Sequence, residues 1–225
     1  MGLVLMGVFG NLIPAFLFTK AETQISSSVT GMLNALTPLF TILIGTAAFK
    51  IEIKKYQIIG VAIGLAGALC LMGFDNSNER SENLNYSLLV VAATTCYAIS
   101  INGIKKFLPE VNSVAAAAGS FFIIGPMALA YLFLNTDFHS HLAQHPQGFS
   151  SLGFICILAI AGTAITIIIY NQVIKMAGIV FAASCTYLIP IVAIGWGMLD
   201  GEAISIIQLA SMGVIILGVW LINKK

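Results

Sequence analysis

Two prolines, Pro38 and Pro190, stand in apolar parts of the sequence with neutral polar residues around them. In a helix, a proline removes one backbone donor and frees the carbonyl four residues earlier, here those of Asn34 and Thr186. Free carbonyls and neutral polar side chains can bind a small solute reversibly through hydrogen bonds. The residues that could form such a binding site are Asn34, Thr37, Pro38, Thr41, Ser184, Thr186, Tyr187 and Pro190.

A structural role is the alternative for the same residues. Proline also bends helices for packing, and Ser and Thr hydroxyls can bond the carbonyl of the preceding turn. Asn11 and Tyr97 are further polar residues in apolar stretches, and each could line the same cavity. For either one alone, a hydrogen bond between neighbouring helices is the simpler explanation.

No catalytic set accompanies these residues. The sequence has no H-E-x-x-H, G-x-S-x-G or phosphate-loop motif, and no Ser/His pair inside an apolar stretch. His139, His141 and His145 follow a metal-like spacing, but they stand in a polar segment, where solvated histidines are the usual case. We therefore expect no enzyme activity, no bound metal and no cofactor.

The composition indicates a membrane protein. Of 225 residues, 8% are charged and 59% are hydrophobic, whereas about 25% are charged in ordinary soluble domains. Mean hydropathy is +0.99. These values exclude a soluble enzyme, a disordered chain and a disulfide scaffold. The net charge of +1 gives no reason to expect a nucleic-acid partner.

The charged residues divide the chain into apolar runs of about one membrane span each, roughly 20 residues. Backbone groups in lipid must be bonded internally, so each run should be a helix. No predicted span contains Asp, Glu, Lys, Arg or His. The predicted spans cover residues 2–19, 25–49, 57–74, 85–104, 113–135, 151–174, 178–199 and 203–222.

Lysine and arginine set the expected orientation. Alternate loops carry Lys50, Lys54, Lys55, Lys105, Lys106, Lys175, Lys224 and Lys225 on one side, against Lys20 and Arg80 on the other. Because positive residues favour the cytoplasmic side, both termini should lie in the cytoplasm. The loop over residues 136–150 then lies outside.

The two proline spans belong to an internal repeat. Pro38 and Pro190 are 152 residues apart (190 − 38), and the pair Gly67 and Gly218 is 151 apart (218 − 67), as is Gln57 with Gln208. The proline spans are the second and seventh, so they cross the membrane in opposite directions. Such an inverted-topology repeat is frequent in secondary transporters. In the span over 57–74, Gly60, Gly64 and Gly67 should let a second helix approach closely.

The chain resembles the EamA-type transporters of the drug/metabolite transporter superfamily. In the first repeat the resemblance rests on Ser26-Ser27-Ser28 through Pro38 and on Thr41, although Phe49-Lys50-Ile51-Glu52 departs from the family's Leu-Gly-Glu-like turn. In the second it rests on Gly178 through Pro190, Leu199-Asp200-Gly201-Glu202, Gln208 and Gly218. The resemblance implies two inverted repeats of five helices each.

The expected fold is therefore an all-α polytopic membrane protein with eight transmembrane helices in an inverted repeat. Residues 1–74 would form a truncated first repeat of three helices, 75–84 a linker outside the cytoplasm, and 85–225 a second repeat of five helices. Two helices of the family pattern would then be missing before residue 1.

The functional hypothesis is a carrier in a bacterial inner (plasma) membrane. It would move a small organic solute (a metabolite, an amino acid or a drug) by alternating access around a midplane cavity. A non-transporting scaffold or an inactive transporter fragment is the alternative. The expected partners are the solute, the lipid bilayer and a second copy in a homodimer.

Overall fold

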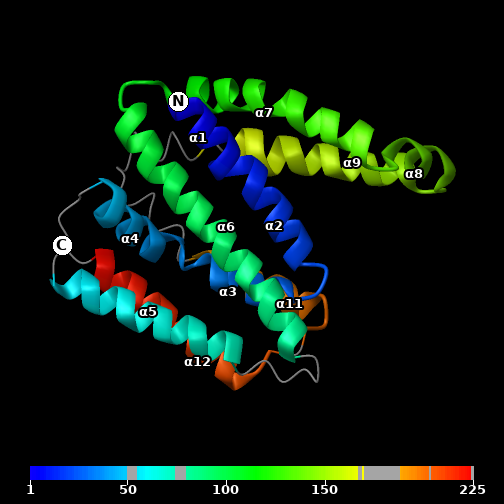
Figure 1. Ribbon diagram of the computed structural model, residues 1–225. Coiled ribbons are helices and arrows are strands. Elements are labelled where there is room, and N and C mark those ends of the chain that lie inside the picture. Colours follow the sequence, from blue (N-terminus) through cyan, green and yellow to red (C-terminus); the bar gives the residue numbers. More distant parts are fainter. Residues whose placement is uncertain (50–54, 74–79, 167–168, 170–187, 203, 224–225) are drawn as a thin grey trace.

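The computed structural model describes residues 1–49, 55–73, 80–166, 169, 188–202 and 204–223, and every regular element within them is a helix. In chain order the elements are α1 (Gly2–Gly7), η1 (Val8–Leu12), α2 (Ile13–Ala21), α3 (Ser27–Asn34), α4 (Thr37–Phe49), α5 (Lys55–Gly73), α6 (Arg80–Phe107), α7 (Ser113–Asn135), α8 (Phe138–Gln144), α9 (Gly148–Leu158), η2 (Ala159–Ile165), α11 (Leu188–Leu199) and α12 (Ile206–Asn223) (Figure 1). The elements η1 and η2 are π-helical.

Within the described residues, four stretches of helix are long and apolar enough to cross a bilayer. They are Gly2–Ala21, Ser27–Ala48, Leu84–Ile104 and Val114–Asn135, with 20 to 22 residues each. At a rise of 1.5 Å per residue, such lengths match a hydrocarbon core of about 30 Å. Shorter apolar helices are Lys55–Leu71, Gly148–Thr163 and Ile206–Leu221. The prediction of an all-α membrane protein is confirmed, whereas the eight spans and the inverted repeat stay predictions.

Part of the loop predicted for residues 136–150 is helical, which corrects that prediction. The segment Phe138–Gln144 forms α8. The ring of Phe138 meets that of Phe133 edge-on, with the two ring centroids 5.8 Å apart. An apolar contact with α7 thus stabilises a helix in a segment whose composition is largely polar.

α6 is the helix around which the first part of the chain is arranged (Figure 1). It packs against α1, η1, α2, α3 and α4. The ring of Tyr97 in α6 stacks on that of Phe18 in α2, with centroids 5.8 Å apart. Gly10 lies directly against Ser100, since a Cβ at Gly10 would come 2.5 Å from Ser100 Oγ.

α5 and α12 lie side by side along most of their length (Figure 1). Glycine allows this approach, because a Cβ at Gly218 would lie 2.5 Å from the backbone nitrogen of Gly64 and 2.6 Å from the carbonyl oxygen of Gly60. Gly67 similarly lies against Ile215. The prediction that these glycines serve close helix packing is confirmed, and the partner is the last helix.

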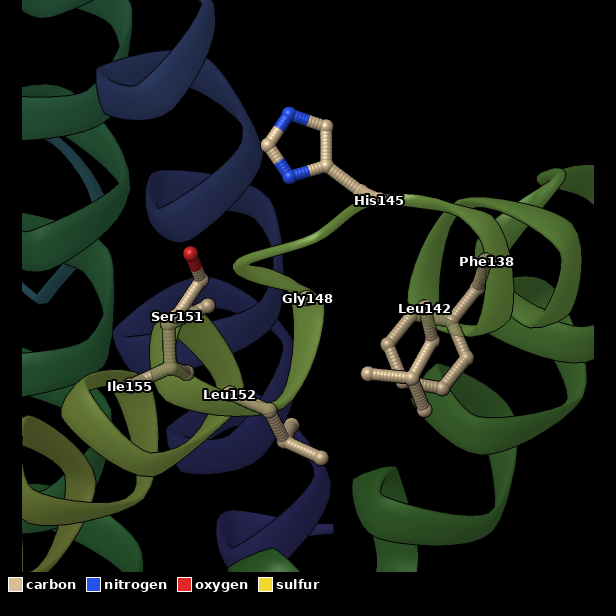
Figure 2. Close-up of a pocket in the computed structure, with 7 residues that line it drawn as sticks. All are labelled: Phe138, Leu142, His145, Gly148, Ser151, Leu152 and Ile155. Atoms are coloured by element: carbon tan, nitrogen blue, oxygen red, sulfur yellow. The ribbon is translucent and has the colours of Figure 1, made fainter.

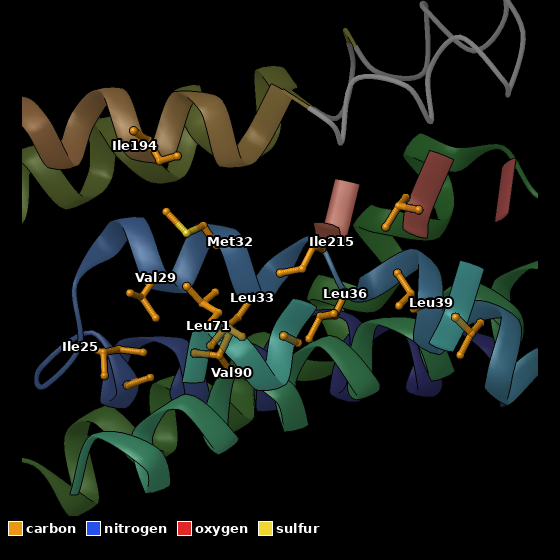
Figure 3. Close-up of a cluster of buried hydrophobic side chains, with 14 residues drawn as sticks. Ile25, Val29, Met32, Leu33, Leu36, Leu39, Leu71, Val90, Ile194 and Ile215 are labelled. Carbon is orange, nitrogen blue, oxygen red and sulfur yellow. The ribbon is translucent and has the colours of Figure 1, made fainter. Parts of the chain in front are cut away.

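The buried apolar core lies among α3, α4, α5, α6 and α12 (Figure 3). Met32, Leu33 and Leu39 are fully shielded at its centre. Away from the core, long apolar side chains on α7 and α9 point outward, among them Phe122 and Phe154, which are 84% and 73% exposed. A helix surface of this kind suits contact with lipid rather than with water.

Candidate functional site

The helix that carries the first proline is interrupted just before it. α3 ends at Asn34 and α4 begins at Thr37. In the break, the amides of Ala35 and Leu36 donate to carbonyls only three residues earlier, at 3.2 and 3.0 Å. Pro38 has no N–H to offer the carbonyl of Asn34, so the regular ladder cannot continue through this point. The span is therefore two short helices with an irregular turn between them.

Thr37 fills the gap that Pro38 leaves. Its hydroxyl donates to the backbone carbonyl of Asn34 at 2.8 Å and lies 3.3 Å from the side-chain oxygen of the same residue. The prediction that the Asn34 carbonyl is a free acceptor is therefore wrong. A β-hydroxyl one turn later is close enough to replace the lost amide donor. The hydroxyl of Thr41 similarly bonds the Thr37 carbonyl at 2.8 Å.

Both hydroxyls bond a carbonyl of the preceding helical turn, as expected if these residues have a structural role. Asn34, Thr37, Pro38 and Thr41 are all half-buried rather than sealed inside the core. A threonine hydroxyl that donates locally keeps acceptor capacity on its oxygen. Solute binding by these four residues stays a prediction.

Asn102 of α6 adds a buried polar contact beside Thr41. Its side-chain nitrogen donates to the Thr41 carbonyl and to the Ala98 carbonyl, each at 2.9 Å. The first bond joins α6 to α4 and the second stays within α6. Sequence reasoning left Asn102 out of the candidate site, because its position near a span end needed no explanation there.

Asn11 and Tyr97 lie on the helices that pack beside this region. Asn11 is in the π-helical element η1, and its side-chain nitrogen donates to the Met6 carbonyl five residues earlier, at 3.2 Å. Tyr97 is half-buried against Phe18. Both have a packing partner, and their part in a cavity stays a prediction.

Of the residues predicted around the second proline, Ser184, Thr186 and Tyr187 lie outside the described residues. Pro190 is in the first described turn of α11. α11 packs on α3, where Gly31 is so close to Ala193 that a Cβ at Gly31 would overlap the alanine methyl. The structure thus brings α11, which contains Pro190, into contact with α3, which ends just before the break at Pro38.

Glu202, just beyond the end of α11, binds the first turn of α3. Its carboxylate oxygen Oε1 accepts from the Ser27 amide at 2.9 Å and from the Ser27 hydroxyl at 2.8 Å. Oε2 accepts from the Ser28 amide at 3.3 Å and from the Ser28 hydroxyl at 2.5 Å. The amides at a helix N-terminus have no partner within the helix, and they favour a negative charge. One carboxylate therefore satisfies two of these amides.

Ser26 completes the capping of α3. Its hydroxyl accepts from the Val29 amide at 3.3 Å. The three serines Ser26, Ser27 and Ser28 thus have separate tasks: the first caps the helix itself, and the other two bind Glu202. Two motifs that carry the family resemblance, 26–28 and 199–202, are in contact across 175 residues of sequence.

The turn after α11 places Glu202 in a fixed position. Gly201 has a φ of 82°, a left-handed conformation that favours glycine. The Glu202 amide donates to the Gly197 carbonyl at 2.8 Å and the Gly201 amide to the Met198 carbonyl at 3.2 Å. These two bonds form a Schellman motif, which ends a helix sharply.

The next helix fixes the other end of the same connection. Ser205 and Gln208 bond one another's backbone amides through their side chains, at 3.1 and 2.8 Å, which is a capping box at the start of α12. Glu202 is thereby held between two rigid helix ends.

The carboxyl of Glu202 is ionised at neutral pH. Partial burial raises its pKa, but the hydrogen bonds from Ser28 and Ser27 outweigh that effect and lower the pKa below its ordinary value of 4.5. Hydrogen bonds to a carboxylate favour the charged form. The sequence does not predict a carboxylate at a functional position, since no predicted span contains Asp or Glu and Glu202 lies between two spans.

A separate apolar pocket lies between α8 and α9, with a volume of about 310 Å³ (Figure 2). Its lining residues are Phe138, Leu142, His145, Gly148, Ser151, Leu152 and Ile155. None of these belongs to the predicted site. The pocket is formed between α8 and the start of α9, and His145 and Ser151 are the polar side chains in a mainly apolar lining.

Comparison with known proteins identifies the family to which the chain belongs. The model of the EamA-like transporter family matches residues 1–73 and 84–224. YedA of Escherichia coli (strain K12), an uncharacterized inner membrane transporter, is 29% identical over 231 residues, which cover 99% of this chain and 69% of that protein. An uncharacterized transporter of Archaeoglobus fulgidus is 22% identical over 221 residues, covering 98% and 76%.

A solved crystal structure has a similar fold. The TM-score is 0.56 with 16% sequence identity, over 98% of this chain and 73% of the other. At that identity the likeness concerns the fold alone. The family match, by contrast, extends over both halves of the sequence and includes the serine and Glu202 motifs that meet in the structure. The chain belongs to the EamA-like transporter family.

Proposed function

We propose that the chain is an inner-membrane carrier that moves a small organic solute by alternating access between two inverted repeats. The observation that carries this proposal is the pairing of equivalent spans. The sequence repeat relates the span over 25–49, which contains α3 and α4 with Pro38, to the span over 178–199, which ends in α11 with Pro190. It also relates α5 to α12 through Gly67 and Gly218. In the structure, α3 packs on α11 and α5 packs on α12. A two-fold relation between the repeats accounts for both pairs.

The π-helical elements support the same relation. The proline offset of 152 carries Val8–Leu12 onto residues 160–164, and η2 covers Ala159–Ile165. In each case a side chain bonds a carbonyl five residues earlier: Asn11 to Met6, and Thr166 to Ala161 at 2.9 Å. π-Helical turns are rare and occur often at functional sites. Two at matching positions favour a repeated unit over coincidence.

The division of the chain follows from these relations. Residues 1–74 would be the first repeat with three spans, 75–84 the linker and 85–225 the second repeat with five. The family match in two segments, 1–73 and 84–224, supports these limits. With eight spans, the proline helices cross in opposite directions beside the repeat interface, where transporters bind solutes on interrupted helices.

Side-chain chemistry limits the solute class. The proposed cavity is lined by neutral donors and acceptors, namely Asn11, Asn34, Thr37, Thr41, Tyr97, Ser184, Thr186 and Tyr187, with Pro38 and Pro190 interrupting the backbone. Such groups bind amides, hydroxyls and zwitterions without a fixed counter-charge. A metabolite, an amino acid or a drug fits this lining.

Contacts between helix ends support the proposed pairing of loops on each side of the membrane, and the lysine count then favours a cytoplasmic location for both termini. Gly2 lies against Leu108, which brings the N-terminus to the loop after α6. Ser27 and Glu202 join the loop before α3 to the loop after α11. In the lysine-based topology, the first pair of loops is cytoplasmic and the second is outside.

Counterflow in proteoliposomes tests the function. The full chain is reconstituted, and uptake of radiolabelled amino acids, sugars and organic cations is measured against an internal pool of the same solute. We expect at least one to exchange, and we expect Thr37→Val and Tyr187→Phe to weaken that exchange. Thr46→Val is the matched control, because Thr46 bonds the Ile42 carbonyl on the same helix, away from the proline.

The outcomes separate the parts of the proposal. Unchanged exchange in Thr37→Val and Tyr187→Phe would show that the assigned site is wrong. If no solute exchanges at all, the chain is not a carrier for these classes and the scaffold alternative is favoured.

A further inference from the structure

We propose that Glu202 is a releasable latch that holds α3 of the first repeat and α11 of the second together on one side of the membrane, and that solute transport requires it to open. The second part of this statement rests on the carrier function proposed above. The first part concerns the structure alone. The two parts can therefore be tested separately.

The latch joins the two repeats through one side chain. Ser27 and Ser28 belong to the first repeat and Glu202 to the second, and four hydrogen bonds connect them. On the α11 side, the Schellman turn and the capping box of Ser205 and Gln208 hold Glu202 in place. A movement of α3 away from α11 must therefore break the carboxylate bonds first.

The partial exposure of the Glu202 carboxylate is suited to a contact that can open and close. Glu202 is half-buried at the end of the helix pair, not sealed within it. When such a contact separates, water can replace the lost hydrogen bonds of both the carboxylate and the amides. A carboxylate deep in the core would instead be left unpaired, which costs several kcal/mol. Both the closed and the open state of the Glu202 contact are therefore energetically accessible.

The residues of α3 and α11 that meet next to the latch have small side chains. Ala193 meets Gly31, and a Cβ at Gly197 would overlap both Ser28 Oγ and Glu202 Oε2. The Ser28 hydroxyl also lies 3.4 Å from the Ala193 carbonyl. Small residues let helices approach closely without interlocking side chains. The carboxylate therefore supplies four polar contacts at this end of the pair, in addition to the burial of Ile194 of α11 in the apolar core.

The α3 donors require a charged acceptor. Two are backbone amides at the positive end of a helix dipole, and two are hydroxyls of the same residues. In Glu202→Gln, one oxygen becomes an amide nitrogen, which presents its donors to a backbone amide that can only donate. We expect this change to weaken the latch without altering the size of the side chain.

A distance measurement tests the latch without any solute. The four native cysteines are replaced by serine, and Thr23→Cys and Leu199→Cys are introduced at exposed positions on either side of the contact. Both are spin-labelled in the full chain in nanodiscs, and pulsed electron resonance gives the distribution of label distances. We expect one short population in the parent and an approximately tenfold larger separated population in Glu202→Gln.

Two matched controls accompany this variant. Asp200→Asn removes one negative charge from the same turn, where Asp200 is exposed, and it should leave the distribution unchanged. Gly197→Ala should separate the labels as Glu202→Gln does, because its methyl displaces the carboxylate. Gly195→Ala should not, since a Cβ there meets nothing within 4 Å.

The results decide the proposal directly. If Glu202→Gln and Gly197→Ala both keep the parent distribution, Glu202 is not a latch. If Glu202→Gln does not fold, as judged by gel filtration, Gly197→Ala decides the same question. Should Asp200→Asn separate the labels equally, the effect is one of net charge and the latch is wrong.

The transport step has its own readout. A bifunctional thiol reagent that joins Thr23→Cys to Leu199→Cys should stop counterflow of any solute that the carrier exchanges. Exchange at the unlinked rate would show that the latch need not open. If no solute exchanges but the label distances shift as expected, the carrier function fails while the latch stands as a clasp between repeats.

Discussion

The side-chain amide of Asn102 donates to the backbone carbonyl of Thr41 across 2.9 Å and so joins α6 to α4. Asn102 is 4% exposed, and its second bond is to the Ala98 carbonyl. α6 in turn contacts α1, η1, α2 and α3. The bond therefore connects α4, which contains Pro38, to α6, the helix against which the first part of the chain packs.

Replacing Asn102 should lower stability. Asn102→Ala removes both bonds and leaves the Thr41 carbonyl without this donor, so we expect a loss of about 1–3 kcal/mol in the free energy of unfolding. Asn112→Ala is a control, because Asn112 caps the exposed start of α7 and should cost only about 1 kcal/mol. Urea unfolding in detergent, followed by fluorescence, measures both. Equal losses would mean that the bond to Thr41 contributes nothing beyond a surface cap.

The helical membrane fold could be predicted because it depends on composition and on spacing between charges. Helices of 20 to 22 residues coincide with the predicted spans over 2–19, 25–49, 85–104 and 113–135. The turn-like composition of 138–148 indicates a loop, whereas residues 138–144 are helical and Phe138 contacts Phe133 of α7. Composition averages over a window and misses such single contacts.

The candidate site could be predicted less completely, because its contacts join distant residues. A proline at 38 predicts a freed carbonyl at Asn34, but the side-chain torsion that lets Thr37 reach that carbonyl is not visible in the sequence. The pairing of Glu202 with Ser27 spans 175 residues. One signal was present in the sequence. The predicted topology places the loop before residue 27 and the loop containing Glu202 on the same side of the membrane, and the free amides at a helix start favour a carboxylate.

Gly218 should tolerate no side chain. A Cβ there would overlap the backbone of Gly64 and Gly60, so Gly218→Ala must push α12 away from α5. Overpacking of this kind costs about 1–3 kcal/mol. Gly213→Ala lies on the same helix, where a Cβ meets nothing within 4 Å, and it should be neutral or slightly stabilising because alanine favours helix. Thermal unfolding in nanodiscs compares the two, and similar midpoints would contradict the packing described for α5 and α12.

The contribution of Glu202 to stability should depend on pH in one direction. Its pKa is lowered in the folded protein relative to the ordinary value of 4.5. The stabilisation is therefore fully present above pH 4.5 and is lost as the pH falls through the lowered pKa. The difference in unfolding free energy between the parent and Glu202→Gln should be constant near neutral pH and shrink in strong acid. A difference that grows on acidification would contradict the assignment of Ser27 and Ser28 as donors to a carboxylate.

Thr37 offers a way to separate a local role from solute binding. Its hydroxyl donates to the Asn34 carbonyl, so Thr37→Val should cost about 1 kcal/mol of stability, whereas Thr37→Ser keeps the hydroxyl and most of that stability. If the hydroxyl oxygen also accepts from the solute, Thr37→Val raises the KM for exchange and Thr37→Ser does not. Thr46→Val loses a similar local bond and should change stability alone. A Thr37→Val carrier with a parent KM would limit this residue to bridging the break between α3 and α4.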